Sequence, residues 1–411
     1  MAKEVGAKKV YFWNSLGGLL NAMLSVYIMM IITRFIGMYE AGIFSLGYAN
    51  ALLLQHVGSF DSRSFQCSTM EDKYHFYDFF SFRLCTCLLM SIITVFWVNV
   101  NDYSLEKTCI TILLSLFCVF SNVSDIFQGN AQKNNRLDLA GKSLAFRIII
   151  NLVVFTIVVI LKRNIYYAVG SMVISSIVWI VVYDHRILSM GHKVCFTIRI
   201  YQFKGLFFNT FPLFLSLFLQ MFIYNMPKYA IDLYMPVESQ AVYSILFMPA
   251  SVVNLFTTFI FKPIIVSLAI KWSQKKYSEV FKSCLKRVGV VFLMILFIAI
   301  VGGILGTQVL SVFYGTDVTD YRIELIIILI GGGFAGTVTL LYYMITIVGK
   351  QYIMLGAYTI TFFITYMTNY LLVKTYGMMG ASLGYLLTSI VACTLLFTIF
   401  LYTYIKMIKK E

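Results

Sequence analysis

The chain has 411 residues, of which 60% are hydrophobic and 12% are charged, and its formal net charge at pH 7 is +14. A soluble domain has roughly 45–50% apolar and about 25% charged residues, so this composition excludes a soluble globular protein and indicates an integral membrane protein. The positive charge does not require nucleic acid as a partner, because basic residues beside membrane spans face the anionic lipid of the inner leaflet.

Long apolar windows predict an all-α integral membrane protein with about twelve transmembrane helices. The apolar runs are continuous rather than alternating, which favours membrane-spanning helices over a β-barrel. The expected spans are residues 10–33, 37–60, 79–99, 108–128, 139–161, 165–186, 205–226, 238–261, 287–313, 323–348, 352–373 and 377–405.

Lysine and arginine predict the orientation of these spans. If the N-terminus is cytoplasmic, most of the 32 basic residues lie in cytoplasmic segments, which is the side where they are normally in excess. We therefore expect both termini in the cytoplasm, and a first helix that is retained rather than cleaved as a signal peptide. The 8 cysteines and 4 histidines show no spacing typical of a disulfide framework or a metal site.

Two short stretches half a chain apart suggest an internal repeat. Residues 41–49 read AGIFSLGYA and residues 240–250 read QAVYSILFMPA, so that Phe44-Ser45 matches Tyr243-Ser244. Halves with an even number of spans run in the same direction across the membrane. We expect an N-terminal six-helix lobe at 1–190, a cytoplasmic linker at 191–204 and a C-terminal six-helix lobe at 205–411, related as parallel repeats.

Two motifs match functional patterns only formally. The glycine-rich stretch 331–336, GGGFAG, fits the dinucleotide-binding pattern G-x-G-x-x-G, but it lies inside an apolar span without the strand and the acidic residue which that site requires. Close helix packing through small residues is the better interpretation. Asn122-Val123-Ser124 is a glycosylation sequon within a predicted span, where no transferase can reach it.

Charged residues in or beside the spans are the main candidates for function, because a charge at membrane depth is costly and usually faces a partner or a water-filled cavity. Arginines and lysines near helix ends can also extend to the lipid headgroups without any functional role. Arg147 either pairs with Asp125 as a structural ion pair or contacts a substrate. The candidates are Arg34, Glu40, His56, Asp125, Arg147, Lys228, Asp232 and Lys262.

The last predicted spans are almost free of charge after Glu324. Between Glu324 and Lys406 the only charged residues are Lys350 and Lys374, both in predicted loops. A polar path through the membrane is therefore expected to be built mainly by the first, second, fourth, fifth, seventh and eighth spans.

The chain resembles the polysaccharide repeat-unit flippases of the multidrug/oligosaccharidyl-lipid/polysaccharide exporter superfamily. The resemblance is spread over about three quarters of the sequence, and NMPKYAID and RSFQCSTMED are its most specific parts. The matching segments are Arg34 with GIFSLGYAN; RSFQCSTMED with Tyr77 and Arg83; DIFQGNAQKNNRLDLAGKSLAFR; NMPKYAIDLY with FMPASVVNLFTTFIFKP; and FYGTD.

This resemblance implies a fold and a substrate. The fold would be like that of multidrug-and-toxin-extrusion proteins, with two six-helix bundles around a cavity that opens alternately to each side. The substrate would be an undecaprenyl-diphosphate-linked oligosaccharide, moved from the cytoplasmic to the outer leaflet of the bacterial cytoplasmic membrane for the assembly of capsule, O-antigen or exopolysaccharide. A polysaccharide polymerase and other assembly proteins would be partners.

The resemblance also suggests roles for individual residues. A diphosphate that crosses hydrocarbon needs cationic partners, for which the candidates are Arg34, Arg63, Arg147, Lys228 and Lys262. No nucleotide-binding P-loop is present in the sequence, so we expect coupling to an ion gradient and no cofactor. The titratable candidates for ion coupling are Glu40, His56, Asp125 and Asp232.

Three alternatives were weighed against the flippase interpretation. A multidrug exporter of the same superfamily would need intramembrane carboxylates for cationic drugs, whereas basic groups predominate here. Lipid II flippases resemble chains of fourteen helices, whereas about twelve are predicted here. A membrane polysaccharide polymerase would be expected to have a long external loop, and an acyltransferase would be expected to have a membrane His/Asn or His/Asp pair. The sequence indicates neither.

Overall fold

The computed structural model describes residues 7–68, 74–348 and 351–408, and for residues 7, 68, 253–266, 351 and 352 it describes the backbone only. Within these residues every regular element is a helix, which confirms the predicted all-α class. The chain divides into two compact units, residues 1–218 and 219–411, and each is described here by itself.

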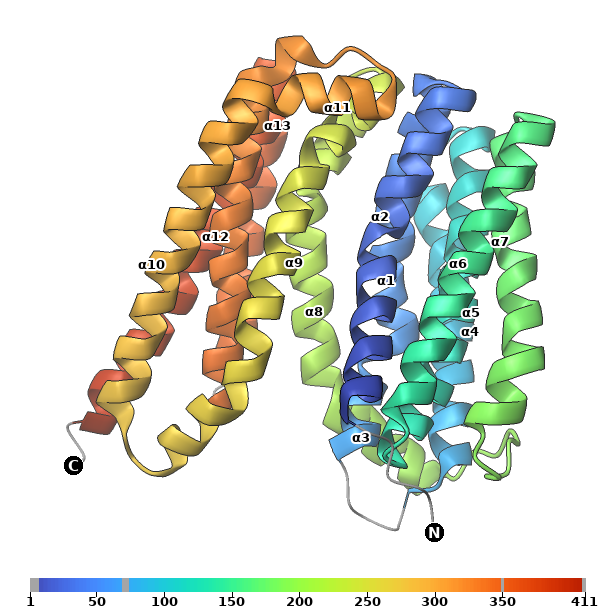
Figure 1. Cartoon of the computed structure of the whole chain (residues 1–411), viewed down its shortest axis with the longest axis vertical. Coiled ribbons are helices and arrows are strands. Elements are labelled where there is room, and N and C mark those ends of the chain that lie inside the picture. Colours follow the sequence, from blue (N-terminus) through green and yellow to red (C-terminus); the bar gives the residue numbers. More distant parts are fainter. Residues whose placement is uncertain (1–6, 69–73, 349–350, 409–411) are drawn as a thin grey trace. The chain divides into compact units, whose positions relative to one another are not determined.

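The N-terminal unit is built from long helices and one short one (Figure 1). A π-helix, η1, continues α7, and the last helix of the unit extends past residue 218 into the second unit. The elements are α1 (Ala7–Phe35), α2 (Met38–Ser59), α3 (Ser62–Ser68), α4 (Phe76–Val100), α5 (Leu105–Lys133), α6 (Leu137–Lys162), α7 (Ile165–Trp179), η1 (Ile180–Leu188) and α8 (Ile200–Tyr234).

The C-terminal unit continues with further long helices, one of which is broken. Helix α13 contains Gly377, whose φ of 56° and ψ of −127° are not helical, so it is two helices joined at a kink. The elements are α9 (Val237–Ser273), α10 (Tyr277–Val301), the π-helix η2 (Gly302–Gly306), α11 (Thr307–Tyr314), the 3-10 helix η3 (Thr319–Tyr321), α12 (Arg322–Ile347) and α13 (Gln351–Ile408).

The helices agree closely with the predicted spans. Every predicted span falls within a helical segment to within one residue at its ends, and two spans share α13 on either side of Gly377. Among the described residues, 9 helices are long and apolar enough to cross a membrane. The number of crossings and the division into six and six remain predictions, as do the linker limits 191–204. Sequence analysis missed the short helix α3.

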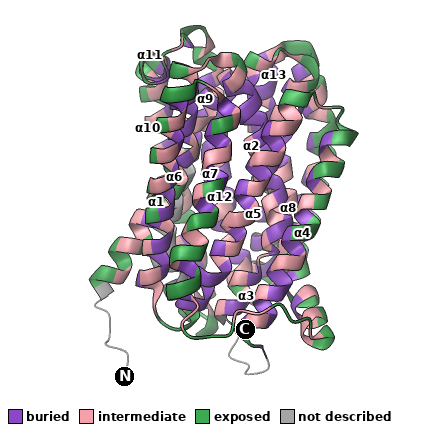
Figure 2. Ribbon diagram, turned by 90° about the vertical axis from the view of Figure 1, so that its right-hand side faces the viewer, coloured by how far each residue is buried: buried purple, intermediate pink, exposed green. Residues whose placement is uncertain are grey.

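The apolar faces of these helices explain why the chain requires lipid. On α10 the side chains of Leu293, Leu296 and Phe297 are largely exposed, and on α4 Ile92 and Phe96 are exposed as well. Figure 2 shows exposed residues in green along α4 and α10. In hydrocarbon, backbone N–H and C=O groups must be satisfied within the segment, which is why such apolar stretches form helices. These exposed apolar faces are suited to contact with lipid tails.

Glycines allow α1 and α6 to approach closely. A Cβ atom added at Gly141 would lie 2.6–2.8 Å from backbone atoms of Trp13 and Asn14, and one added at Gly17 would lie 2.9 Å from the Gly141 carbonyl oxygen. Because these neighbours are backbone atoms, the contact cannot be relieved by a change of rotamer. The packing of α1 on α6 therefore requires glycine at residue 141.

The substitution Gly141→Ala is expected to destabilise the N-terminal unit by roughly 1–3 kcal/mol, which is typical of overpacking. The thermal unfolding of detergent-solubilised protein measures this effect. Gly18→Ala is the matched control, because a Cβ at Gly18 of the same helix α1 meets no atom within 4 Å. Equal melting temperatures for the two variants would contradict the close-packing account.

The glycine-rich stretch 331–336 packs helices together, as predicted. It lies within α12. A Cβ at Gly332 would lie 2.8 Å from the Cβ of Ala250 on α9, and one at Gly333 would lie 1.9 Å from a side-chain atom of Ile295 on α10. The glycines are packed against α9 and α10, which leaves no room for a dinucleotide at these residues.

The two stretches that suggested a repeat have matching local geometry. On α2, Phe44 is buried and its ring stacks on that of Tyr48, with centroids 5.5 Å apart and planes at 12°. On α9, Tyr243 is buried and stacks on Phe247, at 6.1 Å and 24°. The serine after each first aromatic is buried in both helices. The matching geometry favours equivalent positions for α2 and α9 in the two halves.

Candidate functional site

A polar cavity of about 400 Å³ lies within the N-terminal unit. It is lined mainly by α1, α2, α5 and α6, which are the first, second, fourth and fifth predicted spans, as expected for a polar path in this half. The lining residues that carry a charge or a polar group include Asn21, Tyr48, Gln55, His56, Ser59, Asp61, Arg63, Ser121, Asn122, Asp125, Gln128, Arg147 and Asn151.

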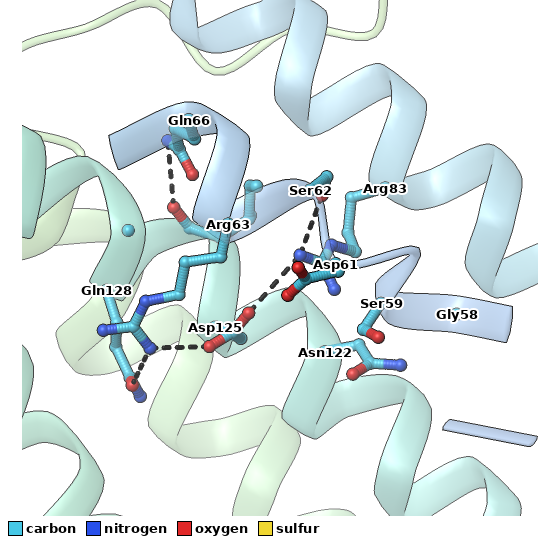
Figure 3. A network of polar contacts seen from close by, with 12 residues as sticks. Gly58, Ser59, Asp61, Ser62, Arg63, Gln66, Arg83, Asn122, Asp125 and Gln128 are labelled. Carbon is cyan, nitrogen blue, oxygen red and sulfur yellow. Dashed lines mark hydrogen bonds and ion pairs between the residues drawn. The ribbon is translucent and has the colours of Figure 1, made fainter. Parts of the chain in front are cut away.

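A tight turn after α2 places Arg63 at this cavity. Phe60 and Asp61 both have positive φ, 47° and 44°, so the chain reverses between α2 and α3. The Phe60 ring stacks on Phe214, with centroids 4.3 Å apart, and meets Phe82 edge-on. These aromatic contacts hold the turn, and α3 then directs Arg63 toward α5 (Figure 3).

Asp125 is the centre of an ion network formed by three helices. Its Oδ1 accepts from Arg63 of α3 at 2.6 Å and its Oδ2 accepts from Arg83 of α4 at 3.3 Å. Arg63 also donates to the amide oxygens of Gln128 and Gln132. Figure 3 shows Asp125 between the two guanidinium groups. Two cations share one carboxylate, so the network carries net positive charge.

Arg83 is the buried side of this network. Its side chain is 0% exposed, and besides Asp125 it donates to the Ser62 hydroxyl at 3.0 Å. Within the described part of the chain its Nε and Nη1 atoms have no hydrogen-bond partner. Sequence analysis named Arg83 only as part of the family resemblance, because its position inside an apolar span does not reveal which carboxylate it reaches.

Arg147 faces the cavity and forms no ion pair with a residue that the structure describes. It is 6% exposed on α6, and its Nη1 donates to the carbonyl oxygen of Ser121 in a long, weak hydrogen bond of 3.5 Å. The predicted alternative of a structural pair with Asp125 is wrong, because Arg63 and Arg83 occupy that carboxylate. A buried, unpaired arginine beside a cavity is well placed to bind an anion.

A buried carboxylate inside a predicted span was missed by sequence analysis. Asp184 lies in the π-helix η1 and is 0% exposed, and it accepts hydrogen bonds of 2.5 Å from the hydroxyls of Ser124 and Ser143. The indole N–H of Trp179 donates to Ser143 in turn. The sequence feature that could have revealed Asp184 is the presence of an acidic residue inside the predicted span 165–186. π-Helices are frequent at functional sites, which makes Asp184 a further candidate for proton binding.

Other predicted site residues lie elsewhere. Arg34 is exposed at the end of α1, and Glu40 lines a separate pocket of about 110 Å³ with Glu106 and Arg163. In the C-terminal unit, Lys228 and Asp232 are half-buried on α8. Lys262 lies in α9, but its side chain is outside the described residues. His56, Arg63, Asp125 and Arg147 are thus the predicted residues that share one cavity.

Asp61 gives the cavity a pH-sensitive group outside the membrane-spanning helices. Burial raises the pKa of its carboxyl to about 6. The hydrogen bond from the Ser64 hydroxyl opposes this rise, the negative charge of Asp125 adds to it, and the positive charge of Arg83 opposes it. Since the folded pKa exceeds the unfolded value of 3.8, the folded state binds the proton more tightly, and this group favours folding as pH falls through 6.

The substitution Asp61→Asn is therefore expected to stabilise the protein at pH 7.5 and to lose about half of that advantage at pH 5. The change between the two pH values should be about 1 kcal/mol after allowance for screening by water. Asparagine tolerates the positive φ of this residue. Melting temperatures of both proteins at the two pH values provide the test, and parallel pH profiles would show that Asp61 does not titrate in this range.

Comparisons with known proteins place this cavity in a recognisable fold. No known family profile matches the sequence. The chain is 26% identical over 309 residues to the capsular polysaccharide biosynthesis protein CapF of Staphylococcus aureus, an alignment that covers 74% of this chain and 78% of that protein.

Solved structures extend the likeness to nearly the whole chain. An inward-facing multidrug resistance MATE family transporter of the MOP superfamily matches with a TM-score of 0.73 and 13% identity, over 95% of this chain and 96% of that one. The lipid II flippase MurJ matches with 0.72 and 15%, over 96% and 89%. The chain has the fold of these transporters. The MATE transporter VcmN of Vibrio cholerae, in its bent form, matches with 0.61 and 15%, over 98% and 97%.

Proposed function

We propose that the protein is a flippase that moves undecaprenyl-diphosphate-linked oligosaccharide repeat units from the cytoplasmic to the outer leaflet of the bacterial cytoplasmic membrane. The units would serve the assembly of a cell-surface polysaccharide such as capsule. Both termini would be cytoplasmic, in agreement with the distribution of lysine and arginine.

The observation that carries this proposal is a pair of arginines at a polar cavity among apolar helices. Arg63 and Arg147 line it, Arg83 lies directly behind Asp125, and Arg147 has no ion pair with any described residue. Arginine forks bind phosphate oxygens in a bidentate manner, and the interaction is strong where water is excluded. A diphosphate headgroup would pair with Arg147 and compete with Asp125 for Arg63.

The rest of the cavity wall suits a sugar. Gln55, Asn122 and Tyr48 line it beside the arginines. The Asn122 amide donates to the Gln55 carbonyl oxygen at 3.2 Å, which leaves the oxygen of that amide for a sugar hydroxyl. The prenyl chain would remain in lipid. Arg34, Lys228 and Lys262 remain proposed cationic partners of the diphosphate.

Energy for transport would come from an ion gradient. Asp125, His56, Glu40 and Asp232 remain the proposed coupling residues. The Asp125 carboxylate is held by two arginines, so a proton or a cation reaching it would free Arg63 for the substrate. This exchange links ion binding to headgroup binding in one network.

The alternatives are supported less well by the cavity. Cationic drugs would need an uncompensated carboxylate; Asp125 is compensated twice, which leaves Asp61 as the candidate among the described carboxylates that line the cavity. A lipid II flippase would use the same diphosphate chemistry, and the relative named for capsular polysaccharide biosynthesis favours repeat units instead. For an enzyme such as a polymerase or acyltransferase, formation of polymer or acyl product from purified repeat units would be the deciding assay.

Loss of the protein from its own cell tests the proposal. Lipid-linked repeat unit is expected to accumulate on the cytoplasmic leaflet while surface polymer disappears, and the wild-type gene should restore both. Variants Arg34→Ala and Lys228→Ala, checked for protein level and membrane insertion, then test the diphosphate-binding role of those residues. Normal surface polymer in cells that lack the protein would refute the flippase proposal.

A further inference from the structure

A second pocket, of about 360 Å³, lies at one end of the N-terminal unit and is separate from the cavity described above. Four chain segments form it: α3, the start of α4, the end of α5 and the segment after η1. The distribution of basic residues places this end at the cytoplasmic surface. The lining residues are Gln66, Tyr74, His75, Phe76, Tyr77, Phe79, Asn130, Lys133, Asn134, His192 and Lys193.

Two lysines of the pocket wall have no carboxylate partner among the residues that the structure describes. Lys133 and Lys193 are exposed at its wall, and neither forms an ion pair with a residue that the structure describes. The neighbouring carboxylate, Asp78, is already matched by Arg199, whose Nε donates to Asp78 Oδ1 at 2.7 Å. The local excess of charge is therefore supplied by the two lysines.

Capping and aromatic contacts order the rim of the pocket. Helix α4 begins at Phe76 in the pocket wall, and its N-terminus is capped by His75 and Asp78. The guanidinium of Arg199 lies 5.1 Å from the centroid of the Tyr77 ring, which orients this ring at the rim. Lys133 is held in a similar way over Phe79, at 6.0 Å from its centroid.

The pocket also contains a buried acceptor that lacks a donor. Gln66 lines it and is 1% exposed, its Nε2 donates to the Ile126 carbonyl oxygen at 3.4 Å, and its Oε1 has no hydrogen-bond partner among the described residues. A buried acceptor without a partner is energetically unfavourable. A phosphate cannot satisfy it, but a hydroxyl group can. The aromatic rings beside it suit the face of a sugar.

We propose that this pocket binds a glycosyl phosphate, with the phosphate at Lys133 and Lys193 and the sugar between Gln66 and the aromatic wall. The inference concerns a different site from the proposed transport cavity and does not depend on flippase activity. The same chemistry is presented by a soluble sugar phosphate and by the headgroup of a lipid-linked sugar diphosphate in the inner leaflet.

Binding to the full chain in lipid nanodiscs distinguishes these sources. Calorimetric titration with glucose 1-phosphate, inorganic pyrophosphate and glucose gives the affinity for the soluble groups. A second set of nanodiscs, containing polyprenyl-diphosphate-linked glucose, tests whether the lipid-borne headgroup displaces bound glucose 1-phosphate. Displacement identifies the lipid source, and binding of glucose 1-phosphate without displacement identifies the soluble one. Wild-type protein that binds none of the phosphate probes in either set would overturn the proposal.

Variants assign the binding to this pocket. Lys133→Gln combined with Lys193→Gln is expected to raise the dissociation constant for glucose 1-phosphate at least tenfold. Lys282→Gln combined with Lys286→Gln, two exposed lysines of α10, removes the same charge elsewhere and should change it less than twofold. Gln66→Met should weaken binding of glucose 1-phosphate and leave pyrophosphate unaffected. An equal loss in both lysine pairs, or unchanged binding in the first pair, would refute the site.

Discussion

Replacing Arg147 by glutamine is expected to reduce flipping of the lipid-linked substrate at least tenfold without impairing folding. The side chain has no ion pair to lose within the described structure, and its single protein hydrogen bond is 3.5 Å long. A charge-assisted bond to phosphate contributes about 1.5–3 kcal/mol, and each 1.4 kcal/mol is about a factor of ten. The rate of flipping in proteoliposomes provides the measurement.

Two further variants sharpen this prediction. Arg147→Lys keeps the charge but not the planar fork, so flipping should be intermediate. Lys162→Gln removes an exposed charge from the same helix α6 and should leave the rate unchanged. If Arg147→Gln flips substrate at the wild-type rate and melts at the wild-type temperature, Arg147 has no part in substrate binding.

The second large effect is expected at Asp125. Asp125→Asn would remove the ion-pair partner that Arg63 shares with the fully buried Arg83, and an unpaired buried charge typically costs 3–5 kcal/mol. Because Asp125 itself is 31% exposed, we expect a loss of about 3 kcal/mol, measured by thermal or denaturant unfolding of the solubilised protein.

The structure also predicts how other substitutions compare with Asp125→Asn in their effect on stability. Adding Arg83→Met to Asp125→Asn should recover much of the stability, since it removes the buried cation. Glu279→Gln breaks the exposed pair with Lys271 on the C-terminal unit and should have no measurable effect. A wild-type melting temperature for Asp125→Asn would show that the network is not structurally important.

Most of the fold was predictable from the sequence, because apolar windows and their limits are local properties. The packing role of Gly331–Gly333 followed in the same way from small residues inside an apolar span. Two features were not predictable. The kink at Gly377 arises from a positive φ that the surrounding sequence does not require, and α3 lies in a polar stretch too short to show a helical period.

The site was predicted less completely, for a physical reason. Asp125 and Arg147 could be selected from the sequence because each is a charged residue inside a predicted span. Their partners could not be predicted, because these depend on packing between segments that are distant in the sequence. Arg63 reaches Asp125 across 62 positions of sequence, and only the positive φ values at Phe60 and Asp61 bring it there. Asp184 and Arg83 could have been singled out as charges within predicted spans, although their hydrogen-bond partners could not.

Flipping by the purified protein tests the central claim most directly. The protein is reconstituted into liposomes that contain undecaprenyl-diphosphate-linked oligosaccharide in both leaflets, and a glycosidase that cannot cross the membrane is added outside. We predict that an imposed ion gradient makes the whole substrate pool accessible with wild-type protein, and that with Arg147→Gln little more than the outer-leaflet fraction is cleaved. If wild-type protein exposes no more substrate than protein-free liposomes do, with or without a proton or sodium gradient, the flippase account is wrong.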